Sequence, residues 1–239
     1  LAGGSRTALM AYLEAAIDDA MTPSREGEAV LRLDGGVLRD VVTGQIPLLV
    51  HVNRASDIRR LLAFKARHPG VKLILVGAGE AWRVADEIAA AGVPVLLNPF
   101  QNLPQRFEMI GARADAAVIL KEAGVTFAIS MSPNTDEAYQ ARLLPQLASN
   151  AVGYGLDAQT ALAAITSVPA DIFGVEAGRI KVGRPATLVV WDGPPLEVMS
   201  SPTLILVEGV ERPLVSRQSE LARRYHPESL ADGEAGYRR

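Results

Sequence analysis

The sequence contains three histidines, and one of them stands where catalytic groups are common. His51 lies near the carboxyl end of the apolar run 46–52, which predicts a buried strand. Barrels and open sheets of the α/β class place their active sites at that end of their strands. An imidazole there can bind a metal or act as a general base, and it can equally be a hydrogen-bonded core residue. His68 and His226 fall in a loop on the opposite rim and in the tail, where we expect no catalytic role.

Two asparagines share the rim that His51 marks. Strand alternation puts His51 and Asn53 on one face, and Asn98 closes the apolar run 93–97. Amide side chains at strand ends can contact a substrate. We therefore take Asn53 and Asn98 as candidate substrate-binding residues.

The loop after the run 125–131 is rich in hydroxyl and carboxyl groups. Ser132 and Asp136 lie within it and are the candidate catalytic residues. A simpler interpretation is also open for Asp136, because aspartate is a good N-cap for the helix expected from residue 136 onward.

Glycines follow the run 71–76 in a pattern that begins like a dinucleotide-binding fingerprint. The pattern is incomplete, because Trp82 occupies the position of the third glycine. Gly77 and Gly79 can instead let the backbone turn tightly or approach a ligand closely. Gly77 is therefore a candidate substrate-binding residue, and a nucleotide site remains the weaker alternative.

The spacing of apolar residues predicts strands that alternate with helices. Near-continuous apolar runs indicate strands of a parallel sheet that is covered on both faces. The repeat is roughly 25–30 residues, the size of one strand–helix step. The expected strands are 46–52, 71–76, 93–97 and 125–131, and the expected helices are 5–21, 55–67, 80–91, 105–123, 136–153 and 158–167.

The pattern changes after residue 175. Residues 178–183 predict a short strand and turn, 187–192 a strong strand, and 204–208 with 210–215 a hairpin. The last stretch is polar and predicts a short helix and a frayed tail. The predicted organisation is therefore an α/β domain over residues 1–175, a small β module over 176–215 and a tail over 216–239.

Composition narrows the classes of function. The chain has 239 residues, a formal net charge of -3 and no cysteine. These values indicate a globular protein without disulfides or thiolate metal sites and without the basic character of a nucleic-acid binder. No apolar run reaches the roughly 18 residues of a membrane helix, so we expect no membrane span. The chain begins with Leu1, and the compartment is left open.

Several segments together resemble the amidohydrolase superfamily, in particular its imidazolonepropionase-like and prolidase-like members. Residues 49–58 resemble the fifth-strand region of these proteins, and 161–175 are similar to a helix that follows their last barrel strand. Residues 178–193, GRIKVGRPATLVVWDG, are the most specific match. Residues 84–95 and 141–146 add weaker similarity, so the resemblance covers nearly all of residues 46–215.

The resemblance implies the C-terminal half of a (β/α)8 TIM barrel, with strands five to eight in this chain, plus a small β-sandwich segment. The missing partner is then the N-terminal half of the barrel, which also carries the HxH motif that this sequence lacks. It further implies hydrolysis of a carbon–nitrogen bond in a small molecule or dipeptide, assisted by a divalent metal, usually zinc. His51 falls on the metal-ligating histidine of strand five.

Two positions depart from the family pattern. The histidine of strand six should fall near Gly77, and the general-base aspartate of strand eight near Ser132. Asp136 lies four residues after Ser132 and is the nearest carboxylate. The alternative is therefore a catalytically degenerate, metal-free binding protein built on the same barrel.

A half barrel has consequences for assembly. We expect exposed strand edges near residues 46–52 and 125–131, and an exposed apolar interior face. Because open edges pair readily with other chains, we expect a homo-oligomer or a complex with the N-terminal half.

Overall fold

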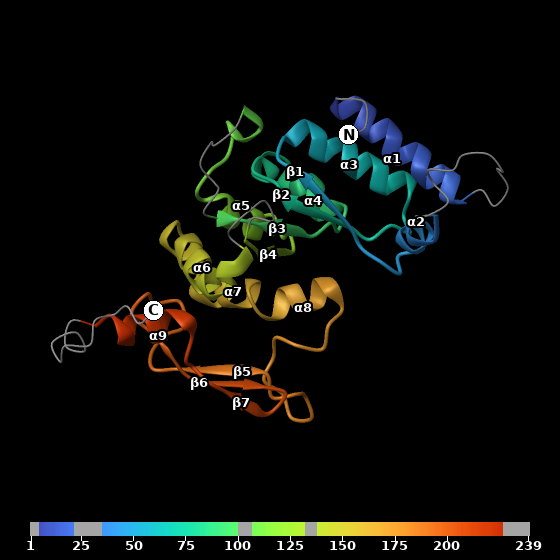
Figure 1. The fold of residues 1–239 in the computed structure, drawn as a ribbon. Coiled ribbons are helices and arrows are strands. Elements are labelled where there is room, and N and C mark those ends of the chain that lie inside the picture. Colours follow the sequence, from blue (N-terminus) through green and yellow to red (C-terminus); the bar gives the residue numbers. More distant parts are fainter. Residues whose placement is uncertain (1–4, 22–34, 100–106, 132–137, 227–239) are drawn as a thin grey trace. The chain divides into compact units, whose positions relative to one another are not determined.

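The sheet that carries the candidate site is parallel throughout and follows the order of the sequence. The computed structural model describes residues 5–21, 35–99, 107–131 and 138–226. Its sheet consists of β1 (Leu48–Val52), β2 (Leu73–Gly77), β3 (Val95–Leu97) and β4 (Phe127–Ile129), in the order β1-β2-β3-β4 (Figure 1). A doubly wound nucleotide-binding sheet reverses its strand order at a switch point, whereas successive neighbours are what a barrel requires. The fold is therefore that of part of a (β/α)8 barrel, as predicted.

Helical segments connect these strands and confirm most of the predicted pattern. α3 (Ala55–Arg67) joins β1 to β2, and α5 (Ala116–Glu122) precedes β4. Three predicted helices are interrupted. The segment 80–91 forms η1 (Ala81–Val84) and α4 (Ala85–Ala90), the described part of 105–123 forms η3 (Phe107–Met109) and α5, and the described part of 136–153 forms η4 (Ala138–Leu143) and α6 (Leu144–Gly153). The other helices described in this unit are α1 (Arg6–Met21), α2 (Gly35–Val42), α7 (Ala158–Ala164) and α8 (Ser167–Phe173).

The helix α3 shows how the sequence positions the sheet. Its buried residues Ala55, Ile58, Leu61 and Phe64 recur every three residues and form one apolar stripe. Phe64 packs in a cluster with Ile17, Val41 and Val71, which ties α1 and α2 to α3 and to the start of β2. The first helix is thus part of the core of this unit.

One face of the sheet carries the row that contains His51. Register pairs His51 with Val76, Val76 with Leu96 and Leu96 with Ala128. Val76, Leu96 and Ala128 form a buried cluster with Ile74, against which Val168 and Ile172 of α8 pack.

Two expectations about exposure are therefore wrong. The predicted open interior face is covered over most of its width by the cluster that α8 contacts. The side chains of β4 are all buried, because α6, α7 and α8 contact this strand, but β4 ends the described sheet and its outer backbone edge pairs with no described strand. By contrast β1 is only half-buried, with Leu49 44% exposed and His51 exposed, although the sequence predicted a fully buried strand. Both β1 and β4 end the described sheet, so the difference arises because α8 packs against the row at Val76, Leu96 and Ala128 and leaves Leu49 and His51 uncovered.

A second compact unit begins after Arg179, at Ile180. It contains an antiparallel sheet of β5 (Leu188–Trp191), β6 (Pro202–Val207) and β7 (Val210–Arg212), followed by α9 (Arg217–Arg224). The strand predicted at 178–183 is wrong: the described backbone there forms turns, with left-handed φ at Gly178 and Gly183. A left-handed residue at each end of so short a segment prevents continuous pairing.

No described residue of this second unit is buried, although its strands are apolar. The unit thus lacks a core of its own among the described residues. None of the described helices in the chain has the length and apolar content required to cross a bilayer.

Candidate functional site

The carboxyl ends of the parallel strands bring most of the predicted site residues to one rim. His51 lies within β1 and Asn53 directly after it, Gly77 ends β2, and Asn98 follows β3. Ser132 and Asp136, the predicted catalytic residues, lie outside the described residues. The rim therefore joins the predicted metal ligand with the three predicted substrate-binding positions.

His51 is the polar member of an otherwise apolar row. Its neighbours in register are Val76 and then Leu96, both buried, whereas His51 itself is exposed. The imidazole is accordingly accessible to a ligand.

Asn98 is the buried polar side chain of the rim, only 5% exposed. A buried amide must be hydrogen-bonded to be tolerated, which makes a structural role compatible with its position. Asn98 directly follows β3 and therefore lies at the same rim as the carboxyl ends of β1 and β2.

The backbone turn that follows β2 is unusual. Gly77 has φ +83° and Ala78 has φ +49°, so two successive residues adopt the left-handed conformation. For alanine this conformation is strained, and such strain persists only where the surroundings impose it.

Hydrogen bonds to the end of β1 hold this turn. The Ala78 N–H donates to the Val52 carbonyl (2.7 Å), and the Glu80 N–H to the Asn53 carbonyl (2.8 Å). The Gly79 N–H donates to Oδ1 of Asn53 (3.3 Å). These are the amides that a phosphate-binding loop would offer to a nucleotide. Because these amides are already bonded and the strand order does not reverse, neither feature supports the nucleotide-binding alternative.

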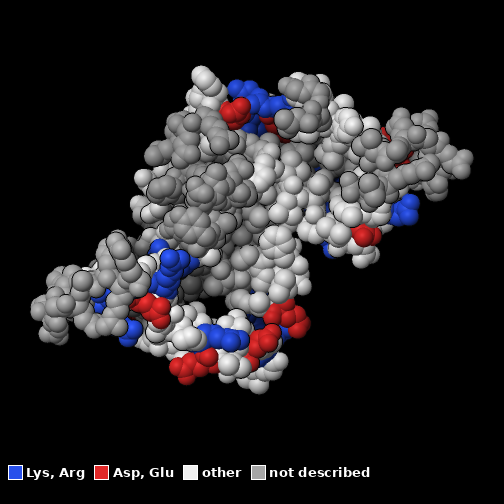
Figure 2. Space-filling model, in the orientation of Figure 1, with Lys and Arg blue, Asp and Glu red and all other residues white. Residues whose placement is uncertain are grey.

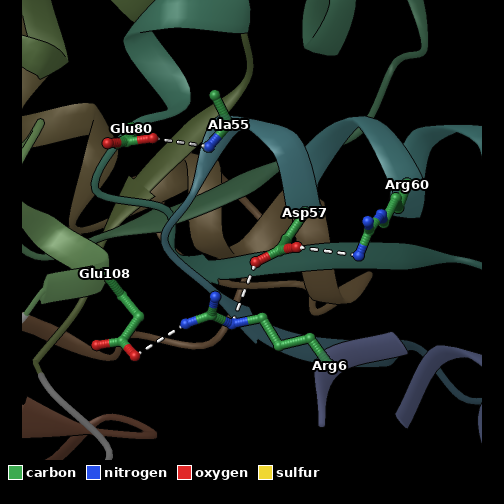
Figure 3. Close-up of polar contacts among 6 residues, drawn as sticks. All are labelled: Arg6, Ala55, Asp57, Arg60, Glu80 and Glu108. Atoms are coloured by element: carbon green, nitrogen blue, oxygen red, sulfur yellow. Dashed lines mark hydrogen bonds and ion pairs between the residues drawn. The ribbon is translucent and has the colours of Figure 1, made fainter. Parts of the chain in front are cut away.

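Glu80 is a further residue of the rim, which the sequence pattern predicted only as the start of a helix. Its Oε2 accepts a hydrogen bond from the Ala55 N–H (3.0 Å), at the first residue of α3 (Figure 3). A carboxylate at this end of a helix is favourable, because it accepts an otherwise unbonded amide. In the sequence, the signal that could have identified Glu80 as a rim residue was its position three residues after the strand end at Gly77.

Charged groups around the start of α3 form a second set of contacts. Arg6 of α1 reaches Asp57 (3.4 Å) and Glu108 (2.8 Å), and Arg60 reaches the other oxygen of Asp57 (3.6 Å; Figure 3). Each pair is partly exposed, so it contributes little stability by itself. Together these pairs connect α1, α3 and η3 beside the rim.

Trp82 connects the loops that follow β2 and β3. Its Nε1 donates to the Gly111 carbonyl (2.7 Å), and Arg83 and Arg113 lie 4.6 and 4.8 Å from its ring centroid. Arg113 also donates to Asp115 and thereby lowers the pKa of that carboxyl. This loop pair is thus held by specific contacts.

A divalent metal does not fit the described residues by themselves. They contain no group of three or more histidine, aspartate or glutamate side chains placed to hold an ion. His51 is an accessible imidazole, but Gly77 offers no side chain. The described rim therefore supplies one imidazole, whereas a protein zinc site usually needs three or four ligands.

A hollow of about 590 Å³ lies on the opposite side, at the amino end of β4. Lys121 and Asp157 form an ion pair on its wall (2.6 Å), and this pair together with the Thr160 hydroxyl and amide strongly lowers the pKa of Asp157. Barrel active sites lie at the carboxyl ends of strands, so this hollow is not the candidate site.

The charges of the surface are mixed. On the face shown in Figure 2, acidic and basic side chains lie beside one another in small groups. This distribution agrees with the small net charge of -3.

Solved structures resemble the chain in fold. An amidohydrolase from Thermotoga maritima matches 90% of this chain and 58% of its own, at 22% identity and a TM-score of 0.77. A prolidase complexed with N-methylphosphonate-L-proline matches 73% of this chain and 47% of its own, at 18% identity and a TM-score of 0.55. The chain therefore spans about half the length of these structures, 58% of the first and 47% of the second.

Sequence comparisons assign the family. The curated Amidohydrolase tasK of Hapsidospora irregularis is 43% identical over 58 residues, which are 23% of this chain and 6% of that protein. A sequence model of the amidohydrolase family matches residues 13–218, most of the chain. The chain belongs to the amidohydrolase family.

Proposed function

We propose that the protein hydrolyses carbon–nitrogen bonds of small molecules or dipeptides, at the rim formed by β1, β2 and β3. The observation that carries this proposal is an exposed imidazole, His51, at the carboxyl end of a parallel sheet in a chain of this family. An amide substrate at this rim would have Asn53 and Asn98 beside it as polar neighbours.

The complete active site requires four further strands. We propose that the N-terminal half of the barrel supplies them beside β1, whose Leu49 is 44% exposed. The share of the Thermotoga structure that this chain matches, 58%, supports the proposal. A homo-oligomer is the other arrangement that would cover this edge.

Zinc remains a proposal for the complete protein, with His51 as the ligand from this sheet. When bound in such a site, zinc supplies an activated water and polarises the scissile carbonyl. No part of the substrate proposal depends on it, because the described residues do not form a metal site by themselves.

A panel of dipeptides and N-acyl amino acids tests the proposal with the full-length protein. Released amine is the readout for the amides, and released alcohol is the readout for esters of the same acids, which are the controls for bond type. We expect amine from at least one class of amide. The proposal would be contradicted if the protein released no amine from any member of the panel although it unfolds cooperatively.

A second candidate is a metal-free binding protein on the same barrel. The glycine at position 77, where the resemblance implies a histidine, favours it. Saturable binding of a dipeptide without turnover, unchanged after dialysis against a chelator, would establish this candidate instead.

A further inference from the structure

Hydrogen bonds link the carboxyl ends of β1 and β2, and each end both donates and accepts. The turn at residues 77–80 donates three amides to Val52 and Asn53, and Glu80 accepts the Ala55 amide in return. We call these four hydrogen bonds the β1–β2 latch. Its side-chain acceptors, Oδ1 of Asn53 and Oε2 of Glu80, both bind backbone amides.

The latch occupies the space in which a side chain at residue 77 would lie. At Gly77, a Cβ would lie 3.1 Å from Oδ1 of Asn53, closer than ordinary van der Waals contact. The backbone there has φ +83°, which any residue with a side chain adopts only at a cost in free energy. A side chain at residue 77 would therefore require both a costly backbone conformation and a displacement of the Asn53 side chain.

The register separates this position from His51 as well. His51 pairs with Val76, whereas Gly77 pairs with Val52, whose side chain is buried on the other face. A histidine at position 77 thus does not share the row of His51.

We propose that the β1–β2 latch replaces a metal-ligand pair, so that these two strands present a single imidazole and no second ligand. Asn53 and Glu80 are then positioning residues, which fix the strand end that carries His51. This inference rests on the proposed function only in its choice of rim. It predicts that adding a histidine at Gly77 breaks the latch and does not create a metal site.

Cobalt(II) is the probe, because its visible absorption reports ligand number and geometry. The full-length protein, Gly77→His and Gly92→His are titrated with CoCl₂ and then unfolded thermally. Gly92 is the matched control, since its φ is +61° and nothing lies within 4 Å of its Cβ position. We expect Gly77→His to bind cobalt no more tightly than the unchanged protein, and to unfold about 5 °C below Gly92→His because latch hydrogen bonds are lost.

The inference would be overturned if the Kd for cobalt fell at least about tenfold in Gly77→His and returned to the original value when His51→Ala was added. Equal unfolding temperatures for the two histidine variants would overturn it also. If Gly77→His does not fold, Gly77→Ala against Gly92→Ala gives the same thermal comparison.

Asn53 supplies an independent readout. Asn53→Ala removes the Oδ1 acceptor, while Asn53→Asp keeps an acceptor oxygen. We therefore expect the unfolding temperature of the aspartate variant to lie closer to that of the unchanged protein. Identical losses in both variants would contradict the latch. Because none of these measurements involves hydrolysis, their failure is distinguishable from failure of the proposed activity.

Discussion

The two units of the chain are both rich in apolar strands, yet they differ in what they bury. In the first unit, every residue of β3 and β4 is buried, and helices supply the covering side chains. In the second unit, no described residue is buried, although β6 contains the run Leu204–Leu206. Apolar strands therefore do not make a core by themselves, because the core requires a second layer.

The comparison also explains the proposed need for partner strands. A three-stranded sheet with no second layer gains little from the hydrophobic effect. The small sandwich that the family resemblance implies would give β5 and β6 that layer, and the half-exposed β1 would gain neighbours in a complete barrel. Sedimentation of residues 1–239 as a monodisperse monomer that unfolds cooperatively would contradict this need.

The same leucine truncation in both sheets should give very different results. Leu75→Ala in β2 removes a fully buried side chain, and we expect a loss of about 2–5 kcal/mol in the free energy of unfolding. Leu206→Ala in β6 removes a partly exposed one, and we expect less than about 1 kcal/mol. Urea unfolding checks both values. Equal losses would show that the second unit has a core after all.

Two glycines with similar backbone conformations allow the cost of backbone strain to be distinguished from the cost of a steric clash. Gly178 and Gly183 have φ +74° and +82°, but a Cβ at Gly178 would lie 2.2 Å from the Thr166 carbonyl oxygen, whereas nothing lies within 4 Å at Gly183. We expect Gly178→Ala to cost about 1–3 kcal/mol more than Gly183→Ala, because the backbone must move. Thermal unfolding of both variants is the measurement, and a difference near zero would contradict the packing at residue 166.

Acid should weaken the Lys121–Asp157 pair of the first unit. The hydrogen bond from Lys121, followed by those from Thr160, lowers the pKa of Asp157 below its ordinary value of 3.8. A lowered pKa stabilises the fold above the ordinary value, and this contribution is lost as the pH falls below about 4. Asp157→Asn, which keeps an N-cap for α7, should therefore lose less stability between pH 5 and pH 3 than the unchanged protein. Parallel pH curves of unfolding would contradict the assignment.

The smallest effect is expected from the tail. α9 has no buried residue, so deletion of residues 216–239 should leave the unfolding midpoint of the first unit nearly unchanged. A large fall in that midpoint would mean that the tail packs on a surface of the protein.

The sequence was sufficient for the four parallel strands and for the position of His51. Residues 73–77 and 95–97 are apolar throughout, and periodicity detects such runs directly. It was not sufficient for exposure, because whether Leu49 or Phe127 is covered depends on helices far along the chain. Apolar spacing ended the predicted helix at residue 167 and did not detect α8, whose Pro169 is unfavourable inside a helix but is tolerated here in the first turn.

The site was less predictable than the fold. Ala78 carries no sign of a left-handed φ, since this conformation is imposed by its bond to Val52 and by the neighbouring turn. Glu80 likewise gains its role only when α3 and η1 meet. The predicted roles of Asn53, Asn98 and Gly77 remain predictions, and those of Ser132 and Asp136 concern residues outside the described ranges.

The most direct test compares two imidazoles on opposite rims. His51 stands at the carboxyl end of β1, and His68 follows α3 and packs against the Phe64 ring at 4.7 Å. For the amide that the full-length protein hydrolyses best, we expect His51→Gln to lower kcat/KM by about 10–100-fold or more and His68→Gln to leave it unchanged. An unchanged kcat/KM in His51→Gln, in protein that remains folded, would contradict the account.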